Sequence, residues 1–255
     1  MSITLYRFED DPRPRLGLLV LQADETIEDD FRRFFNPDRV RLHISRVPSG
    51  DELNPATIEA MRADLPAAAR ILPRSVTFDV VGYACTSGAT MIGPERVQSL
   101  VKSGCTTNQV TDPLTATRAA LQALNAKRLA ILSPYIPSVA EPLHCAFEEA
   151  GLEIAGTLSY GEETEANVAR MAPQVLADAA RELAKETEAD ALFLSCTNLR
   201  TLGILDSLEA ELGIPVLSSN QALAWHMAWL AAMNIHPAPI GRLMRDYKPL
   251  GGTSN

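Results

Sequence analysis

The feature that most constrains the fold of this chain is an internal repeat. The motif Cys-Thr-x-x-x-Thr begins at Cys85 and begins again at Cys196, 111 positions later. In both places a short apolar run precedes the cysteine and a polar turn follows it. Because recurrence at a fixed offset is the signature of a repeated structural unit, the sequence predicts two similar halves.

Three further pairs of segments recur in the same order as the cysteine motifs, at a nearly constant offset. One such pair could arise by chance, because short apolar runs are common, but four pairs in register favour a tandem duplication. The alternative is two generic βαβ units that share turn residues. The further pairs are 15–21 with 128–133, 107–110 with 219–222, and 113–125 with 222–233.

Short apolar runs of strand length alternate along the chain with longer stretches of helical periodicity. Strands are expected near 15–21, 39–47, 76–83, 128–133, 190–195 and 214–217, and helices near 26–35, 54–70, 92–102, 113–125, 137–150, 165–186, 203–212 and 221–233. Such alternation is typical of a mostly parallel sheet covered by helices on both faces. The sequence therefore predicts an α/β protein with two small, similar domains that face each other across a cleft.

The domain boundaries follow from the position of the repeat. We expect the first domain to comprise residues 1–112 and 220–255, because the last helix is expected to return to it, and the second to comprise 113–219. A linker is expected near 104–113.

The composition supports a folded protein and excludes several kinds of partner. Apolar residues make up 46% of the 255 positions, which is enough for a core, and the net charge of −9 disfavours nucleic acid or an anionic membrane. No apolar run approaches the roughly 20 residues of a membrane span, and no secretory signal is evident at the N-terminus. We therefore expect a cytoplasmic protein whose four cysteines are free thiols.

Cys85 and Cys196 are the leading candidates for catalysis. Each follows a predicted parallel strand, and ligands in such sheets bind outside the carboxyl ends of the strands. Backbone N–H groups at a helix start would favour the thiolate and also suit a carboxylate ligand. If the halves are related by a pseudo-twofold axis, the two thiols could remove a proton from one face of a carbon and return it to the other. The alternative is that each thiol is a small buried apolar group.

Other chemistry has little support in the sequence. There is no Cys-x-x-Cys or paired-histidine spacing for zinc, no glycine-rich phosphate loop, and no histidine beside a plausible nucleophile. Cysteine-dependent hydrolysis is therefore a poor interpretation.

Several segments resemble the aspartate/glutamate racemase superfamily, and specifically its maleate cis-trans isomerase and arylmalonate decarboxylase branch. They are Ala84–Gly88, Ser195–Asn198, Ser218–Gln221, Thr26–Glu28 and Ser133–Tyr135. The resemblance implies two Rossmann-like domains with the site between them, no metal and no organic cofactor. It also implies a homodimer or a higher homo-oligomer.

The same resemblance implies roles for individual residues. Cys85 would be the nucleophile of a maleate-type isomerase, and Cys196 would donate and remove a proton at the neighbouring carbon. The decarboxylases carry glycine in place of the first cysteine, so Cys85 argues against simple decarboxylation. Tyr135 would bind a substrate carboxylate, and the backbone N–H groups of Thr86 and Thr197 would support a developing enediolate. The implied substrate-binding set is Asp24, Thr86, Ser87, Tyr135, Glu165, Thr197 and Asn198.

Two acidic residues depart from the isomerase pattern. Asp24 and Glu165 stand where the isomerases carry asparagines, although Asn167 could fill the second position instead. An amide donates hydrogen bonds to a carboxylate, whereas an ionised acid repels it, so a substrate ammonium suits Asp24 better than maleate does. The loop Asp24–Glu28 also resembles ectoine-utilisation members of the superfamily, whose substrates carry amino groups. Asp24 could instead only cap the helix expected at 26–35.

The sequence thus predicts a cofactor-independent isomerase or racemase of a small carboxylic acid, either an amino acid or a dicarboxylic acid. One alternative is maleate cis-trans isomerase proper, which would act through a covalent cysteine adduct. The other is a non-catalytic protein that only binds a carboxylate.

Overall fold

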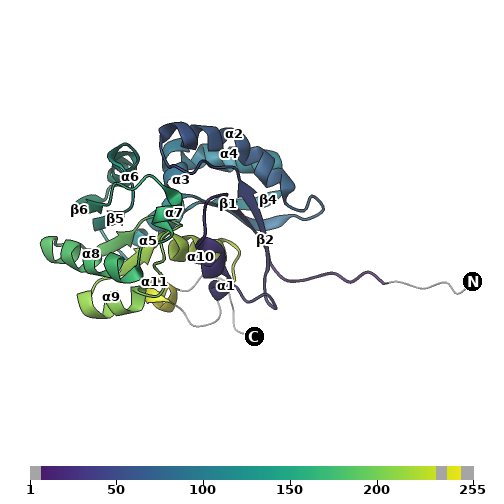
Figure 1. Cartoon of the computed structure of the whole chain (residues 1–255). Coiled ribbons are helices and arrows are strands. Elements are labelled where there is room, and N and C mark those ends of the chain that lie inside the picture. The colour runs from purple at the N-terminus through teal and green to yellow at the C-terminus, as the bar shows by residue number, and fades with distance from the viewer. Residues whose placement is uncertain (1–6, 234–239, 248–255) are drawn as a thin grey trace, which may run out of the picture.

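The computed structural model describes residues 7–233 and 240–247, and within them the chain forms two four-stranded parallel sheets (Figure 1). The first sheet has the order β2-β1-β3-β4 and the second has the order β6-β5-β7-β8. The first contains β1 (Arg15–Leu21), β2 (Arg41–Val47), β3 (Phe78–Ala84) and β4 (Thr107–Thr111), and the second contains β5 (Arg128–Ser133), β6 (Glu153–Ser159), β7 (Ala191–Leu194) and β8 (Val216–Ser218). The identical strand order confirms the predicted α/β fold with two similar halves.

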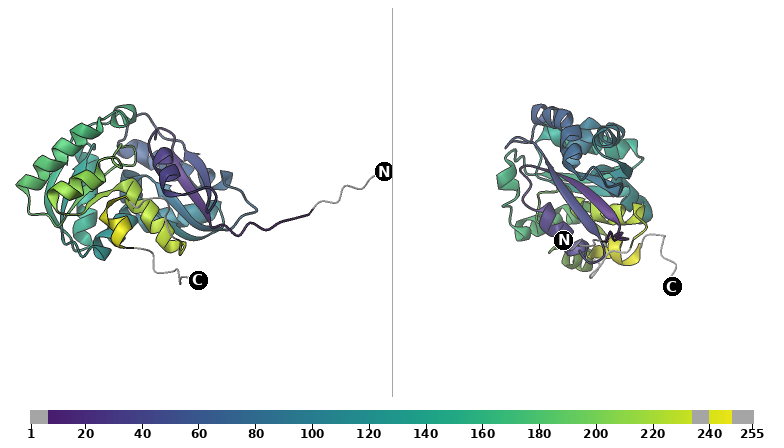
Figure 2. Two further views of the ribbon diagram at one scale, coloured as in Figure 1. Left: turned by 90° about the horizontal axis from the view of Figure 1, so that it is seen from below. Right: turned by 90° about the vertical axis from the view of Figure 1, so that its right-hand side faces the viewer.

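Helices cover both sheets (Figures 1 and 2). They are α1 (Ile27–Phe34), α2 (Pro55–Ile71), α3 (Thr86–Ile92), α4 (Pro94–Gly104), α5 (Pro113–Ala123), α6 (Pro137–Glu149), α7 (Glu165–Val168), α8 (Pro173–Glu186), α9 (Leu205–Leu212), α10 (Ser219–Leu230) and α11 (Gly241–Asp246). Proline at the first helical position begins α2, α4, α5, α6 and α8, where its missing N–H costs no hydrogen bond.

The central strands β1 and β5 are buried on both faces, which explains their near-continuous apolar sequences. The helix α10 follows β8 of the second sheet but packs on β3 and β4 of the first, and it also contacts α5. Gly82 permits this close packing, because a Cβ there would lie 2.7 Å from the sulfur of Met227 on α10. The two halves therefore share a helix.

The domain boundaries stay a prediction, and the described helices near the C-terminus divide between the sheets. Whereas α10 lies on the first sheet, α11 packs against α9 and β8 of the second. The backbone N–H of Arg242 on α11 donates to the Glu209 carboxylate of α9 at 2.8 Å.

Two expectations about the repeat were wrong. The segment 104–113, expected as a linker, contains the edge strand β4. The sequence of this strand is mostly polar, so it lacks the apolar run by which the other strands are recognised. As a result, residues 107–109 lie in a strand while their supposed equivalents 219–221 lie in α10, so this match is accidental. The structural equivalents are the residues that cap α5 and α10: Asp112 accepts from the Thr115 N–H, and Ser218 accepts from the Gln221 N–H.

In the part of the chain that the structure describes, no helix combines the length and apolar character needed to cross a membrane.

Candidate active site

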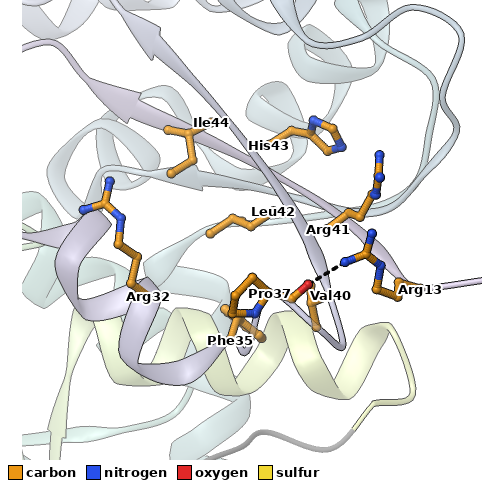
Figure 3. Close-up of a pocket in the computed structure, with 9 residues that line it drawn as sticks. All are labelled: Arg13, Arg32, Phe35, Pro37, Val40, Arg41, Leu42, His43 and Ile44. Atoms are coloured by element: carbon orange, nitrogen blue, oxygen red, sulfur yellow. Dashed lines mark hydrogen bonds between the residues drawn. The ribbon is translucent and has the colours of Figure 1, made fainter. Parts of the chain in front are cut away.

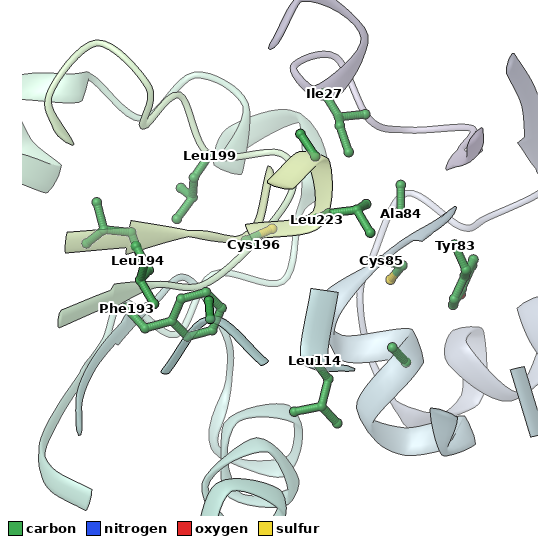
Figure 4. Packing of buried hydrophobic residues seen from close by; sticks show 14 of the residues in the cluster. Ile27, Tyr83, Ala84, Cys85, Leu114, Phe193, Leu194, Cys196, Leu199 and Leu223 are labelled. Carbon is green, nitrogen blue, oxygen red and sulfur yellow. The ribbon is translucent and has the colours of Figure 1, made fainter. Parts of the chain in front are cut away.

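The two cysteines lie directly beyond the carboxyl ends of β3 and β7, which occupy equivalent positions in their sheets. In Figure 4 each sulfur atom is on the side of its residue nearer the other cysteine. Both residues are almost fully buried, and Ser219 joins their turns, since its hydroxyl lies 2.8 Å from that of Thr86 and accepts from the Cys196 N–H at 3.1 Å. The structure therefore brings the paired cysteines to one site between the halves.

Cys85 is the N-cap of α3, and hydrogen-bond donors surround its sulfur. The Gly88 N–H donates to Sγ at 3.2 Å, and the Ser87 hydroxyl lies 3.5 Å away. The Tyr83 hydroxyl is buried without a hydrogen bond of standard geometry, although it lies near enough to the sulfur to lower the pKa of the thiol. Burial outweighs these donors and raises the pKa of Cys85 to about 11. The thiolate, once formed, would nevertheless find donors already in place.

Cys196 has different surroundings. Its φ of 155° is rare for a residue with a side chain, and its N–H donates to the Ser219 hydroxyl at 3.1 Å. Burial and then the Glu165 carboxyl raise the pKa of its thiol well above the ordinary value, and Asp24 raises it further. Only the backbone N–H of Asn198 is a cause in the other direction. This sulfur is therefore held as a thiol.

Hydrogen bonds across the halves join the turns that follow the cysteines. The hydroxyls of Thr86 and Ser219 are 2.8 Å apart, and the Ser219 hydroxyl also accepts from the Cys196 N–H. Ser219 therefore links the turn after Cys85 to the turn at Cys196. The Thr197 hydroxyl donates to the Ala84 carbonyl at 3.4 Å, and the Asn220 amide donates to the Thr197 carbonyl at 2.8 Å. These contacts fix the relative positions of the two turns.

Asp24, in the loop after β1, has one oxygen that holds a turn and one that is unsatisfied. Its Oδ1 accepts from the N–H groups of Thr26 and Ile27 at 2.8 and 2.9 Å, and so holds the turn that leads into α1, although Thr26 is the N-cap residue of that helix. Its Oδ2 is buried and makes no hydrogen bond of standard geometry, although Thr197 lies near enough to lower its pKa. Burial dominates and raises the pKa of this carboxyl.

Glu165 reaches the site from the first turn of α7. Its N–H donates to the Asp51 carbonyl at 3.0 Å, so the first half holds this segment of the second. Burial raises the pKa of its carboxyl to about 7, while a 2.8 Å hydrogen bond from the Asn198 amide opposes the shift. Asn167 is exposed and donates to Glu162 instead. Of the two candidates considered, the structure thus brings Glu165 to the site.

The side chain of Asn198 is engaged by protein groups on both sides. Its Oδ1 accepts from the Glu25 N–H at 2.9 Å, and its Nδ2 donates to Glu165. Its carbonyl accepts from the Thr26 hydroxyl at 2.9 Å. Asn198 therefore links the loop of Asp24 to the segment of Glu165, and its substrate-binding role stays a prediction.

Tyr135 is buried beyond the end of β5 and lies near both thiols. Burial raises the pKa of its phenol well above the ordinary value, and Cys196, Cys85 and Glu165 raise it further. Because both thiols and Glu165 affect the pKa of its phenol, Tyr135 lies near other residues that the sequence assigned to the site.

Some residues of the site were missed at the level of sequence. Ser219 and Asn220 belong to a segment that carried the family resemblance, but nothing in their spacing assigned them to the Cys196 turn. Asn220 also donates to the buried carboxylate of Asp30 at 2.7 Å. The sequence does not point to Tyr83 as a site residue, because an aromatic residue within an apolar strand is typical of the hydrophobic core.

A pocket of about 800 Å³ lies on the outer edge of the first sheet, away from the cysteines (Figure 3). Arg13 and Arg41 line it and share the carboxylate of Asp11, while Phe35 and Leu42 provide apolar walls. None of the site residues predicted from the sequence lines this pocket. Among the described residues, no group of three or more His, Cys, Asp or Glu side chains is arranged to hold a metal ion.

Comparisons with known proteins cover most of the chain. The chain is 28% identical to a maleate isomerase of Nocardia farcinica over 252 residues, covering 91% of this chain and 96% of the relative. It is 33% identical to an arylmalonate decarboxylase of Bordetella bronchiseptica, over 52% of this chain and 56% of the relative. Among solved structures, a cysteine-to-serine variant of the Nocardia farcinica maleate cis-trans isomerase has a TM-score of 0.82 at 26% identity, covering 91% of this chain and 98% of that chain. That variant holds a covalently bound succinylcysteine intermediate.

These relatives indicate an isomerase. The family model for arylmalonate decarboxylase matches residues 60–244, well over half of the sequence and including both cysteine turns. The chain therefore belongs to the arylmalonate decarboxylase family, within the branch of the aspartate/glutamate racemase superfamily that also contains the maleate isomerases.

Proposed function

We propose that the chain is a cofactor-independent isomerase or racemase of a small carboxylic acid, with Cys85 and Cys196 as its catalytic pair. The observation that carries this proposal is the contrast between two neighbouring thiols at equivalent strand ends. The Glu165 carboxyl raises the pKa of both thiols, but the Gly88 N–H and the Ser87 hydroxyl lie beside the Cys85 sulfur, whereas Asp24 is a second carboxyl that raises the pKa of Cys196. One thiol is thus suited to act as thiolate and the other as proton donor.

For an unsaturated substrate, the reaction proceeds through a covalent adduct. The Cys85 thiolate adds to one alkene carbon while the Cys196 thiol delivers its proton to the neighbouring carbon, and the former double bond becomes a freely rotating single bond. After rotation, the Cys196 thiolate removes a proton and the carbon–sulfur bond breaks. The trans alkene leaves, and the starting thiolate and thiol are restored.

For a substrate with a stereocentre next to its carboxylate, the same pair performs racemisation. One thiolate removes the α-proton, and the other thiol delivers a proton to the opposite face. Backbone N–H groups of Thr86 and Thr197 would stabilise the enediolate formed between the two steps. In both reactions one proton is taken and one is returned.

Maleate isomerase activity itself is the second candidate. It is favoured by the succinylcysteine intermediate in the related structure and by the presence of Cys85 in this chain. The buried carboxyls of Asp24 and Glu165 oppose it, since they would face a dianionic substrate. Conversion of maleate to fumarate by the purified protein would establish this activity.

The proposal is tested by incubating the protein with a panel of amino and dicarboxylic acids in deuterium oxide. Proton NMR would detect loss of the α-proton signal, alkene isomerisation or decarboxylation in the same tube. We expect exchange or isomerisation that disappears in Cys85→Ser and Cys196→Ser. Normal turnover in both variants would refute the proposal. A protein that only binds carboxylates would instead leave every ligand chemically unchanged, and its two thiols would be inert toward iodoacetamide at neutral pH.

A further inference from the structure

A buried carboxylate that the proposed reaction does not use lies on α1, two hydrogen bonds away from the Cys196 turn. Asp30 is 7% exposed, and its Oδ2 accepts from the Nδ2 of Asn220 at 2.7 Å. Among the described residues, its side chain has this one hydrogen-bond partner and no ion pair with a lysine, arginine or histidine. Asn220 is at the start of α10, which packs against α1 (Figure 1). Because burying a charge is costly, a carboxylate in this position requires an explanation.

The amide of Asn220 joins this carboxylate to the Cys196 turn. Its Nδ2 carries two hydrogens and donates both to Asp30 and to the Thr197 carbonyl, the second bond at 2.8 Å. Its Oδ1 is buried without a partner, so these two bonds determine how the amide is oriented. If the amide were reversed, its oxygen would face two acceptors and could bind neither. Asp30 and Thr197 therefore fix the amide from opposite sides.

The bond to Thr197 acts on the peptide group that lies beside the Cys196 sulfur. The Thr197 carbonyl and the Asn198 N–H belong to this one planar group, in which they point in opposite directions. The Asn198 N–H lies near enough to the sulfur to lower the pKa of the Cys196 thiol, in opposition to burial and Glu165. A bond that fixes the carbonyl therefore also fixes the N–H that would stabilise a thiolate.

Resting on the function proposed above, we infer that Asp30 is a positioning residue. Through Asn220 it holds the 197–198 peptide group in the orientation that lets the Asn198 N–H stabilise the Cys196 thiolate during proton transfer. A hydrogen bond to an ionised acceptor is roughly twice as strong as one between neutral groups, so a carboxylate holds the amide more firmly than a hydroxyl or a second amide would.

The surroundings of Asp30 leave it ionised in alkaline solution. Burial raises the pKa of its carboxyl to about 7, whereas a hydrogen bond and Arg33 on the same helix oppose the shift, and Asp24 and Asp29 add to it. The titratable residue of α10 is His226, which is neutral because burial lowers its pKa to about 4. At pH 9 the acceptor that faces the amide is therefore a carboxylate.

The test compares Asp30→Asn with Asp30→Leu. Both variants lose the charge and have nearly the same size, but only asparagine offers an acceptor to Asn220. Labelling by iodoacetamide at pH 9 is followed by peptide mass spectrometry, so that Cys196 and Cys85 are measured in the same sample. We expect Asp30→Leu to label Cys196 about three- to tenfold more slowly than Asp30→Asn does, with Cys85 labelled equally in both. A residue that only stabilises the fold would give the opposite result, since local opening exposes both thiols and speeds both reactions.

Asn220→Ala removes the amide itself and keeps the inference testable if Asp30→Leu does not fold. It should slow the labelling of Cys196 by a similar factor, and adding Asp30→Leu to it should cause no further slowing. The control is Asp29→Leu, the same exchange at an exposed neighbouring position, which should leave both labelling rates as in the wild type. Equal labelling of Cys196 in Asp30→Leu and Asp30→Asn, a wild-type rate in Asn220→Ala, or faster labelling of both thiols in Asp30→Leu would overturn the inference.

Turnover provides a second readout, with a substrate found in the deuterium oxide panel. The kcat of Asp30→Leu should fall by about 10- to 100-fold while KM changes by less than about threefold, because the variant misplaces a reacting group and not the substrate. Asp30→Asn should retain at least about a third of the wild-type kcat. Thiol labelling needs no substrate, so failure of this inference is distinguishable from failure of the proposed function.

Discussion

The two halves of the molecule have the same strand order but treat their cysteines differently. In the first half, Cys85 caps a helix and its sulfur accepts from the Gly88 N–H at 3.2 Å. In the second half, Cys196 enters an irregular turn with a φ of 155°, and Glu165 is the charged group that most raises the pKa of its thiol. The two sulfur atoms therefore lie at equivalent strand ends, but the groups around them affect the pKa of each thiol differently.

This difference shows how a duplicated scaffold can support an asymmetric reaction. A proton transfer that starts and ends on different groups requires one member of the pair to be protonated when the other is not. Donors at one strand end and a second carboxyl at the other make Cys85 the thiol that ionises first, although both thiols are protonated near pH 8. The shared helix α10 maintains it, since Ser219 contacts both cysteine turns.

The largest expected effect comes from exchanging each sulfur for oxygen. Cys85→Ser should lower turnover by about 10⁴-fold or more, and mass spectrometry should detect no substrate adduct, because serine is a far weaker nucleophile. Cys196→Ser should also lose turnover, yet it should retain an adduct on Cys85 when an unsaturated acid is supplied. Cys145→Ser, on an exposed thiol, serves as the control and should behave as wild type. Equal adduct formation in Cys85→Ser and Cys196→Ser would contradict the different roles assigned to the two thiols.

The order of alkylation provides a second, smaller contrast. The pKa of Cys85 is about 11, so its thiolate fraction near pH 8 is about 10⁻³ and rises about tenfold with each pH unit up to 10. Iodoacetamide should therefore label Cys85 faster as pH rises, with Cys196 labelled later because burial, Glu165 and Asp24 all oppose ionisation of its thiol. Peptide mass spectrometry would follow each site, with Cys145 as the internal reference. Earlier labelling of Cys196 would contradict the assigned roles.

The strand ends and the two cysteines could be predicted because they belong to buried strands, whose apolar runs are visible in the sequence. Edge strands are harder, since only one side is paired and their side chains face water. The strand β4 reads Thr-Asn-Gln-Val-Thr and was mistaken for a linker, and β6 (Glu153–Ser159) was not anticipated. Likewise the sequence does not predict α3 (Thr86–Ile92), because Thr, Ser and Gly are typical turn residues, and the helix expected near 92–102 corresponds to α4 (Pro94–Gly104).

Contacts between the halves could not be predicted at all. The proximity of Thr26 to Asn198, or of Thr86 to Ser219, depends on how two separately formed sheets pack. The sequence could assign Asp24 and Glu165 to the site only through the family resemblance. It could not show that one oxygen of Asp24 holds the turn before α1 while the other is left without a partner.

A glycine exchange tests whether the donors around Cys85 depend on close packing. A Cβ at Gly88 would overlap the Tyr83 hydroxyl and lie 2.9 Å from the Cys85 sulfur. Gly88→Ala should therefore displace the sulfur, lower turnover by about 100-fold and destabilise the fold by about 1–3 kcal/mol. Gly203, in the segment after Cys196, has open space around it, and Gly203→Ala should change neither turnover nor melting temperature. Similar effects of Gly88→Ala and Gly203→Ala on turnover and melting temperature would show that the packing around Cys85 is no tighter than the packing after Cys196.

The smallest effect is expected at Tyr83, and it isolates the donors from the packing. Tyr83→Phe removes a buried hydroxyl that makes no hydrogen bond of standard geometry but lies near the Cys85 sulfur, while the ring stays in the core. Loss of this donor raises the pKa of Cys85, so alkylation at pH 9 should slow by about threefold, with the unfolding free energy changed by about 1 kcal/mol or less. Tyr160→Phe removes a half-exposed hydroxyl bonded to the Val175 carbonyl and should leave Cys85 labelling unchanged. Faster labelling in Tyr83→Phe would mean that the phenol shields the sulfur rather than stabilising its charge, and the difference between the two halves would then rest on the carboxyls beside Cys196 alone.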